Sequence, residues 1–357
     1  MKIGIIGLPQ TGKKSLFEVL TQYSPTQQDI ISNKSLKSMA EIKDSRFDGL
    51  VEIYNPKKQL RARIDIELLP KIEKDVIAKG DIFKDIADLD AVCHLVRVFD
   101  DESVYHVSGT PDAKRDIDRI NCELILNDLI FIEKRLQRIE GNLKKVKDQD
   151  AQKERELLLK LKQQLDKEEP LRLLELDKQQ QKIIASYPFI TFKKMIVVLN
   201  VSEDKLNDFS LLEELKQNYK DSNIDIMQVS AKAELEIAGL QSESERKEFL
   251  QALGIKEPAI NILTRLCIKA LDLVSFFTVG PDEVRQWTVT KGSTAPEAAG
   301  QIHTDLQKGF IRAEIMESEE LIAAGSAEKL KQAGKFYLKG KDYIVQDGNV
   351  LCIRFNV

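Results

Sequence analysis

The first twenty residues combine two hydrophobic patterns that predict a strand followed by a helix. Lys2–Ile6 is a short apolar run of the kind found in buried strands, and Leu16, Phe17 and Leu20 have helical spacing. Between them lies the glycine-containing segment 7–15, GLPQTGKKS. The order of strand, glycine-rich loop and helix predicts a phosphate-binding P-loop.

The spacing within this loop has a physical reason. Gly7 and Gly12 allow backbone dihedrals that other residues avoid, so successive N–H groups can turn toward phosphate oxygens. Lys13 can reach the β- and γ-phosphates, and the helix adds its positive amino end. The motif places Ser or Thr directly after this lysine to hold Mg²⁺, but Lys14 stands there and Ser15 follows one residue late. The pattern therefore predicts nucleotide binding and leaves metal-dependent hydrolysis open.

Further buried strands are predicted at 91–98, 195–199 and 224–229, which gives an α/β fold. Residues 114 to about 182 are rich in Lys, Glu, Gln and Leu. Their apolar spacing predicts an antiparallel helical hairpin with a coiled-coil seam that turns near 148–151. From residue 275 onward, short strands alternate with turns, which indicates a small β-rich module. The predicted organisation is a nucleotide-binding domain (1–113 and 192–273), an inserted hairpin domain (114–191) and a terminal domain (274–357).

Several loops of the nucleotide-binding domain carry candidate chemistry. Residues 23–43 are polar and predict a loop where a nucleotide switch would lie. The alternating run 59–69 predicts a strand that ends at Asp65, which either reaches Mg²⁺ through water or is an ordinary strand end, since Leu68 stands where the motif expects glycine. His94 lies within strand 91–98 and is interpreted as a packed core residue. His106 follows that strand at the carboxyl edge of the sheet, where ligands bind, although a single loop histidine is usually only exposed.

The predicted base-binding residues follow two later strands. Asn200 and Glu203 stand where guanine-nucleotide proteins carry Asn-Lys-x-Asp, whose Asp accepts hydrogen bonds from guanine. Because Glu203 is longer and the lysine is absent, adenine becomes plausible. The sequence Ser-Ala-Lys at 230–232 is a common loop beside the base. The candidate nucleotide-binding residues are Gly7, Gln10, Thr11, Gly12, Lys13, Lys14, Ser15, Asn200, Val201, Glu203, Ser230 and Ala231, and the candidate Mg²⁺ ligands are Ser15 and Asp65.

Composition restricts the function classes. With 42% hydrophobic and 31% charged residues, the chain of 357 residues has the composition of a globular protein with long exposed helices. No apolar run approaches a membrane span and no signal-peptide layout is present, so we expect no membrane partner. The four cysteines are scattered without paired metal spacing, which indicates a reducing compartment and predicts a cytoplasmic protein.

The distribution of charge predicts one candidate nucleic-acid surface. A net charge of −4 argues against nucleic-acid binding over the whole surface. Residues 134–147 nevertheless carry six Lys or Arg residues against one Glu, toward the tip of the predicted hairpin. A charge run of this kind is usually a solvated helix face, but a basic tip on an acidic protein is also a candidate RNA contact.

With these motifs in place, the chain resembles the YchF / Obg-like ATPase family of P-loop NTPases related to translation factors, and the resemblance runs nearly end to end. The most specific part is similar to the family's TGS domain: 284–305 (VRQWTVTKGSTAPEAAGQIHTD), 308–314 (KGFIRAE), 341–348 (KDYIVQDG) and 354–357 (RFNV). Four shorter motifs support it in the first domain: Gly-Leu-Pro at 7–9, Asp-Ser-Arg at 44–46, His-Val-Ser-Gly at 106–109 and Asn-Val-Ser-Glu at 200–203.

The resemblance implies a G domain with an inserted coiled-coil domain and a C-terminal β-grasp-like TGS domain. It also implies ATP hydrolysis, with ATP preferred to GTP in many members because of the Asn-x-x-Glu motif. Lys13 would bind phosphate, Asn200 and Glu203 would read the base, and His106 matches the catalytic histidine that positions the attacking water. The implied partner is the ribosome or ribosomal RNA, contacted through the TGS domain and the basic hairpin tip by a monomeric protein.

The chain departs from the family pattern at the metal and γ-phosphate end of the site. Gln10 replaces Asn, and Lys14 and Ser15 replace Ser-Thr. The metal-binding Thr of the first switch has no clear counterpart near 32–38. The second switch, within 65–90, keeps only Gly80, so a loop that closes on the γ-phosphate is lost.

Two hypotheses follow from these departures. The first is a slow ATPase, translation- or stress-linked, in which Ser15 or Asp65 still places Mg²⁺. The second is a non-hydrolysing nucleotide sensor or scaffold that acts through the TGS and coiled-coil domains, with Lys14 supplying the charge of the missing metal. We favour retained nucleotide binding with poor hydrolysis.

Overall fold

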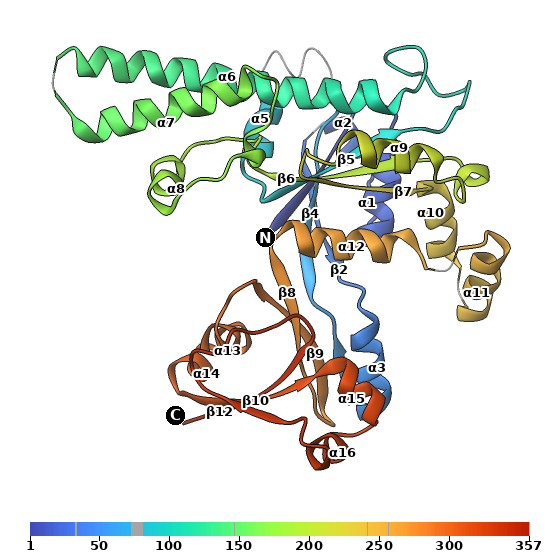
Figure 1. The fold of residues 1–357 in the computed structure, drawn as a ribbon. Coiled ribbons are helices and arrows are strands. Elements are labelled where there is room, and N and C mark those ends of the chain that lie inside the picture. The colour runs from blue at the N-terminus through green and yellow to red at the C-terminus, as the bar shows by residue number, and fades with distance from the viewer. Residues whose placement is uncertain (33, 73–80, 146, 241, 256, 357) are drawn as a thin grey trace. The chain divides into compact units, whose positions relative to one another are not determined.

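Two sheets organise the chain, one in each of two compact units. The structure is a computed structural model that describes residues 1–32, 34–72, 81–145, 147–240, 242–255 and 257–356. The first unit comprises residues 1–38 and 65–260, and the second comprises residues 39–64 and 261–357. Residues 39–64, which the sequence analysis assigns to the nucleotide-binding domain, thus belong with the C-terminal part of the chain. Figure 1 shows the elements of both units.

The sheet of the first unit has the strand order β2-β4-β1-β5-β6-β7. Its strands are β2 (Leu36–Glu41), β4 (Arg63–Leu68), β1 (Lys2–Ile6), β5 (Ala91–Arg97), β6 (Lys194–Asn200) and β7 (Ile224–Val229). All pairings from β4 through β7 are parallel. The carboxyl ends of these strands therefore meet at one edge, which brings the segments after β1, β5, β6 and β7 together. The predicted α/β fold with a P-loop domain is confirmed.

Two predictions about this sheet are wrong. The run 59–69 is not one strand, because β3 (Lys58–Leu60) pairs with β9 (Glu283–Thr290) in the second sheet and β4 begins only at Arg63. The strand β4 also continues past Asp65 to Leu68. Residues 23–43 are not a loop, because they contain the helix α2 (Gln27–Ser32) and the strand β2.

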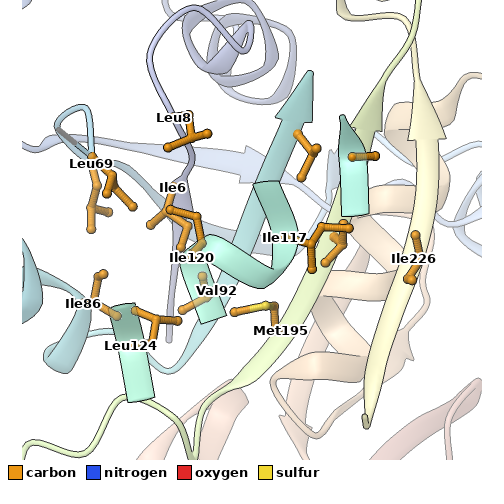
Figure 2. Close-up of a cluster of buried hydrophobic side chains, with 14 of the residues drawn as sticks. Ile6, Leu8, Leu69, Ile86, Val92, Ile117, Ile120, Leu124, Met195 and Ile226 are labelled. Carbon is orange, nitrogen blue, oxygen red and sulfur yellow. The ribbon is translucent and has the colours of Figure 1, made fainter. Parts of the chain in front are cut away.

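Helices cover the parallel sheet and extend from it. In the first unit they are α1 (Lys13–Thr21), α2, α5 (Asp81–Ala87), α6 (Ala113–Leu143), α7 (Gln149–Leu165), α8 (Lys178–Ile184), α9 (Ser210–Asn218), α10 (Ala231–Gly239) and α11 (Glu243–Ala252), with short 3₁₀ turns at Leu171–Leu173 and Glu203–Lys205. The helix α12 (Ala259–Ala270) begins at the end of the first unit and belongs mostly to the second. In Figure 2, Ile6 and Val92 of the sheet meet Ile117, Ile120 and Leu124 of α6 in one buried cluster. His94 is 1% exposed, which confirms its interpretation as a packed core residue.

The predicted helical hairpin is present as α6 and α7, which lie side by side (Figure 1). Its seam is a buried cluster that includes Ile132, Leu136, Ile139, Leu158, Leu161 and Leu165. Asp148 caps α7 by accepting hydrogen bonds from the N–H groups of Asp150 and Ala151. At the base of the hairpin, the fully buried Asp128 accepts hydrogen bonds from the backbone N–H groups of Ile190 and Thr191. These bonds fix the long helix to the segment that leads into β6.

The second unit contains a mixed sheet with the strand order β11-β10-β12-β8-β9-β3. Its elements besides β3 are β8 (Leu273–Thr278), β9 (Glu283–Thr290), β10 (Phe310–Glu317), β11 (Tyr337–Lys339), β12 (Asn349–Phe355), α3 (Ser45–Tyr54), α13 (Ala295–Ile302), α14 (Thr304–Lys308), α15 (Ser318–Ala324) and α16 (Ala327–Gln332). The strand β12 lies parallel to β8, while β8–β9 and β10–β12 are antiparallel, which is a β-grasp-like arrangement.

Two hydrophobic clusters hold this second unit together. Ala295, Ala298 and Ala299 of α13 pack with Phe276 of β8 in one of them. The other joins α3 and α15 to the sheet through residues that include Phe47, Leu50, Phe277 and Leu321. The packing of α3 explains why residues 39–64 group with the C-terminal sheet. Within the described parts of the chain, no helix is both long and apolar enough to cross a membrane.

Candidate nucleotide-binding site

The P-loop has a conformation that only its two glycines allow. Gly7 and Gly12 have φ values of +153° and +92°. A Cβ on Gly7 would lie 2.4 Å from the carbonyl oxygen of Leu95, and a Cβ on Gly12 would lie 2.3 Å from Nδ2 of Asn200. The Thr11 hydroxyl donates to the carbonyl oxygen of Leu8 at 3.1 Å. The loop is therefore tightly folded against β5 and β6 before any ligand binds.

Lys13 lies inside this loop. Its side chain is buried, and Nζ donates to the carbonyl oxygen of Gly7 at 2.5 Å. The pKa of the neighbouring His94 is lowered to about 3. The main cause is burial of its imidazole, and the positive charge of Lys13 is the smaller cause. His94 is therefore neutral at physiological pH and adds no positive charge beside Lys13.

Asn200 connects the P-loop to the loop that precedes α10. Its Nδ2 donates to the carbonyl oxygen of Thr11 at 2.9 Å, and its Oδ1 accepts from the N–H of Ala231 at 3.0 Å. Ser230 caps α10, because its hydroxyl accepts from the N–H of Ala233. Because both polar atoms of its amide bond to the backbone, Asn200 positions the two loops. Its predicted contact with the base stays a prediction.

Glu203 lies in the 3₁₀ turn after β6 and faces the same loop. Its Oε1 is 3.0 Å from Nζ of Lys232, and this carboxylate raises the pKa of that lysine. Val201 is buried and donates its N–H to the carbonyl oxygen of Val229. The structure thus brings together most of the predicted nucleotide-binding residues: Gly7, Thr11, Gly12, Lys13, Asn200, Val201, Glu203, Ser230 and Ala231. Gln10 adopts a left-handed conformation in the same loop, with a φ of +61°.

The metal end of the site differs from the prediction. Asp65 pairs with Lys2 at the start of β1, so it lies near the end of the sheet opposite the P-loop. Its carboxylate is 3.7 Å from the amino terminus of Met1. The prediction that Asp65 binds Mg²⁺ is therefore wrong. Where β4 ends, the chain continues as Leu69, Pro70 and Lys71.

Lysine side chains occupy this metal end. Lys14 is exposed at the start of α1, and its pKa is lowered by partial burial and then by the charge of Lys71. The two lysines line one pocket of about 60 Å³ with Lys13 and Lys34. The described residues include no group of three or more His, Cys, Asp or Glu side chains that could hold a metal ion. The lysine side chains at this end of the site do not fit Mg²⁺, which prefers oxygen ligands in octahedral geometry. Within the predicted second switch, 65–90, residues 73–80, which include Gly80, lie outside the described residues.

His106 is buried rather than exposed. Its Nδ1 accepts a hydrogen bond from the N–H of Ser108 at 3.1 Å, and its Nε2 lies 3.2 Å from Oδ2 of Asp116. The other carboxylate oxygen of Asp116 accepts from Nε of Arg115 at 2.9 Å. The predicted catalytic side chain is thus held against the first turn of α6.

Arg97, which sequence reasoning missed, shapes the loop that carries His106. Its buried guanidinium donates to the carbonyl oxygens of Phe99, Asp101 and Val104, and stacks over the ring of Phe99 at 4.6 Å. These bonds fold the segment after β5 into a compact loop. The available signal was an arginine within an otherwise apolar strand, since such a residue must find several acceptors when buried.

Comparisons with known proteins agree along the whole chain. Residues 273–356 match the family model YchF-GTPase_C, described as "Protein of unknown function (DUF933)". The "Ribosome-binding ATPase YchF" of Bacillus subtilis is 40% identical, over 99% of each chain, and that of Haemophilus ducreyi is 38% identical, over 100% of this chain and 99% of the relative. The solved structure of the Schizosaccharomyces pombe YchF GTPase superposes with a TM-score of 0.82 at 27% identity and covers 99% of this chain and 97% of that one.

Proposed function

The chain belongs to the YchF family, and from this premise we propose that it binds ATP or GTP at its P-loop, associates with the ribosome as a translation- or stress-linked regulator, and hydrolyses nucleotide only weakly. Relatives named ribosome-binding ATPases support the first two parts of this proposal. The third part rests on the residues of this chain that differ at the metal end of the site.

The observation that carries nucleotide binding is the position of Asn200. It joins the carbonyl of Thr11 to the N–H of Ala231, so the phosphate loop and the loop beside the base are held at one place. Such preorganisation lowers the ordering cost of binding. The positive amino end of α1 and the ammonium group of Lys13 favour phosphate there.

Weak hydrolysis is supported by two features of the site. Phosphoryl transfer depends on Mg²⁺ and on a group that orients the attacking water. Lys14 stands where the family places its metal-binding hydroxyl, and Ser15 is the remaining candidate ligand. His106 is buried against Asp116 and would have to leave that contact to reach water at a γ-phosphate.

Ribosome association is supported by charge on the hairpin and by the similarity of the C-terminal domain. Beside its tip the hairpin exposes five of the predicted basic residues: Lys134, Arg138, Lys144, Lys145 and Lys147. The sixth, Arg135, is paired with Glu154. Exposed lysines and arginines bind RNA phosphates with release of counterions, so this contact would weaken steeply with salt. The β-grasp-like second unit would supply the other contact.

A non-hydrolysing nucleotide sensor or scaffold is the second candidate function. It is favoured by the lysines at the metal end, since a compact ammonium group offsets phosphate charge without orienting oxygens for transfer. In this case the TGS-like and coiled-coil parts would bind the partner, and nucleotide binding without hydrolysis would only change their conformation.

ATP binding and turnover, each measured with Mg²⁺ and with EDTA, test the proposal. We expect binding in both and slow turnover with Mg²⁺ that is lost in His106→Ala and kept in His303→Ala, an exposed histidine of the second unit. Binding without turnover would overturn the ATPase and leave the scaffold. Absence of nucleotide affinity, with Lys13→Ala unchanged in every assay, would overturn both. Ribosome co-sedimentation at rising salt, with residues 275–357 deleted, tests the partner.

A further inference from the structure

Four lysines from three separate segments line one pocket beside the P-loop. Lys13 and Lys14 come from the start of α1, Lys34 from the segment between α2 and β2, and Lys71 from the residues after β4. The pocket has a volume of about 60 Å³. This convergence was not visible in the sequence, where the lysines are up to 58 positions apart.

Among the described residues that line this pocket, one carboxylate faces the four ammonium groups. This is Asp29, which already accepts hydrogen bonds from the N–H and hydroxyl of Thr26 and from the hydroxyl of Tyr23. Among these described lining residues, lysines thus outnumber carboxylates by four to one. The site has the electrostatic character of a polyanion site, and like charges at this spacing repel a further cation.

In a standard P-loop, Lys13 would act with Mg²⁺, which binds the oxygens of two phosphates and offsets their charge. Here Lys14, Lys34 and Lys71 line one pocket with Lys13, and the candidate acidic ligand Asp65 lies near the other end of the sheet. A nucleoside triphosphate without metal carries about four negative charges, which matches a site with several lysines. Its magnesium complex carries about half that charge and brings a dication close to Lys14 and Lys71.

We propose that this pocket binds the terminal phosphates of a metal-free nucleoside triphosphate, with Lys14, Lys34 and Lys71 in place of Mg²⁺. This inference rests on the proposed nucleotide binding at the P-loop and names the ionic form that is bound. Because Mg²⁺ withdraws the free triphosphate from solution, free Mg²⁺ competes with the protein for nucleotide. The occupancy of the site therefore rises as the free Mg²⁺ concentration falls.

Isothermal titration of the full chain with ATP, in EDTA and in excess Mg²⁺, tests this inference. We expect the Kd to be at least about tenfold lower in EDTA, because the magnesium complex brings a dication close to Lys14 and Lys71. Inorganic tripolyphosphate should also have a lower Kd in EDTA than in excess Mg²⁺, since the proposed contacts are to phosphate and not to the base. Lys14→Gln and Lys71→Gln should each raise the Kd in EDTA by about tenfold.

The matched control is Lys160→Gln, which neutralises an exposed lysine on α7, away from this pocket. It should leave the Kd in both solutions unchanged. The double variant Lys14→Ser with Lys71→Gln should remove the preference for the metal-free form, because it restores a hydroxyl after Lys13 and deletes two repelling charges. Circular dichroism and thermal midpoints of each variant separate loss of binding from loss of folding.

The outcomes distinguish the inference from the proposed function. If Mg²⁺ tightens ATP binding to the unaltered chain, or if Lys14→Gln and Lys71→Gln match Lys160→Gln in EDTA, the inference is wrong while nucleotide binding stands. If ATP binds in neither solution and Lys13→Ala changes nothing, both are wrong. Tighter binding in EDTA that depends on Lys14 and Lys71 supports both.

Discussion

The imidazole Nε2 of His106 lies 3.2 Å from the carboxylate of Asp116, and both side chains are almost completely buried. Since Nδ1 of this histidine accepts from the N–H of Ser108, a neutral ring carries its proton on Nε2, the nitrogen nearer Asp116. The pair joins the loop after β5 to the first turn of α6. The contact with Asp116 thus holds the imidazole of His106, the candidate catalytic group, in place.

Replacing this carboxylate tests its role as a clamp on the loop. In Asp116→Asn we expect amide hydrogen exchange in residues 103–109 to become about tenfold faster, because a buried charge-assisted contact worth about 1.4 kcal/mol is weakened. Asp150→Asn, at a carboxylate that is 95% exposed on α7, is the control. Turnover should be no lower than in the unaltered chain. A fall in turnover would instead mean that Asp116 orients His106 for catalysis.

Asn200 and Glu203 are predicted to have separable roles. In Asn200→Ala the Thr11 carbonyl and the Ala231 N–H lose their buried partner, which should cost about 2–3 kcal/mol and weaken ATP and GTP binding equally. Glu203→Gln should change the ratio of the two affinities, because Glu203 is the residue that we predict to read the base. Titration of both nucleotides into both variants measures the ratio. A changed ratio in Asn200→Ala would contradict the assignment of Asn200 as a positioning residue.

Gly12 offers a test of the preformed loop. An alanine there would place Cβ 2.3 Å from Nδ2 of Asn200 and would hold a φ of +92°. Gly12→Ala should therefore abolish detectable nucleotide binding and lower the thermal midpoint. At Gly239, which is within α10, a Cβ would meet nothing within 4 Å. Gly239→Ala should bind nucleotide normally and be stabilised by about 0.5–1 kcal/mol. Normal binding by Gly12→Ala would mean that the loop rearranges when ligand binds.

The parts predicted from sequence are those in which local pattern decides the structure. The β1–P-loop–α1 unit and the hairpin seam of Ile132, Leu136 and Leu158 follow from spacing along one element. The location of Asp65 could not be derived in this way. Alternation of apolar and polar residues does not indicate which end of a strand lies at the ligand-binding edge of the sheet. In addition, the run 59–69 contributes to β3 and β4, which belong to two different sheets.

Contacts between distant segments were also beyond the sequence. The pairing of β3 with β9, which places residues 39–64 in the second unit, joins positions more than 200 apart. The link from His106 to Asp116 and the convergence of Lys14 with Lys71 likewise depend on tertiary packing. Motif reading therefore found the P-loop residues and singled out Lys14, but it did not find Lys34 and Lys71, which line the same pocket.

Glu234 makes the stability of the first unit depend on pH. Its carboxyl is buried on α10, and burial raises its pKa to about 7 although the N–H groups of Ala259 and Ile260 bond to it. The folded state therefore binds a proton that the unfolded chain, with an ordinary pKa near 4.5, has released. Stability from this group is fully present below pH 4.5 and is lost as the pH rises to about 7, by about 3 kcal/mol.

Glu234→Gln keeps an acceptor for Ala259 and removes the titration. Its thermal midpoint should equal that of the unaltered chain near pH 4 and exceed it by several degrees at pH 8. Glu236→Gln, at an exposed position on the same helix, should follow the unaltered chain at every pH. Parallel profiles for Glu234→Gln and the unaltered chain would show that the Glu234 carboxyl is ionised in the folded state.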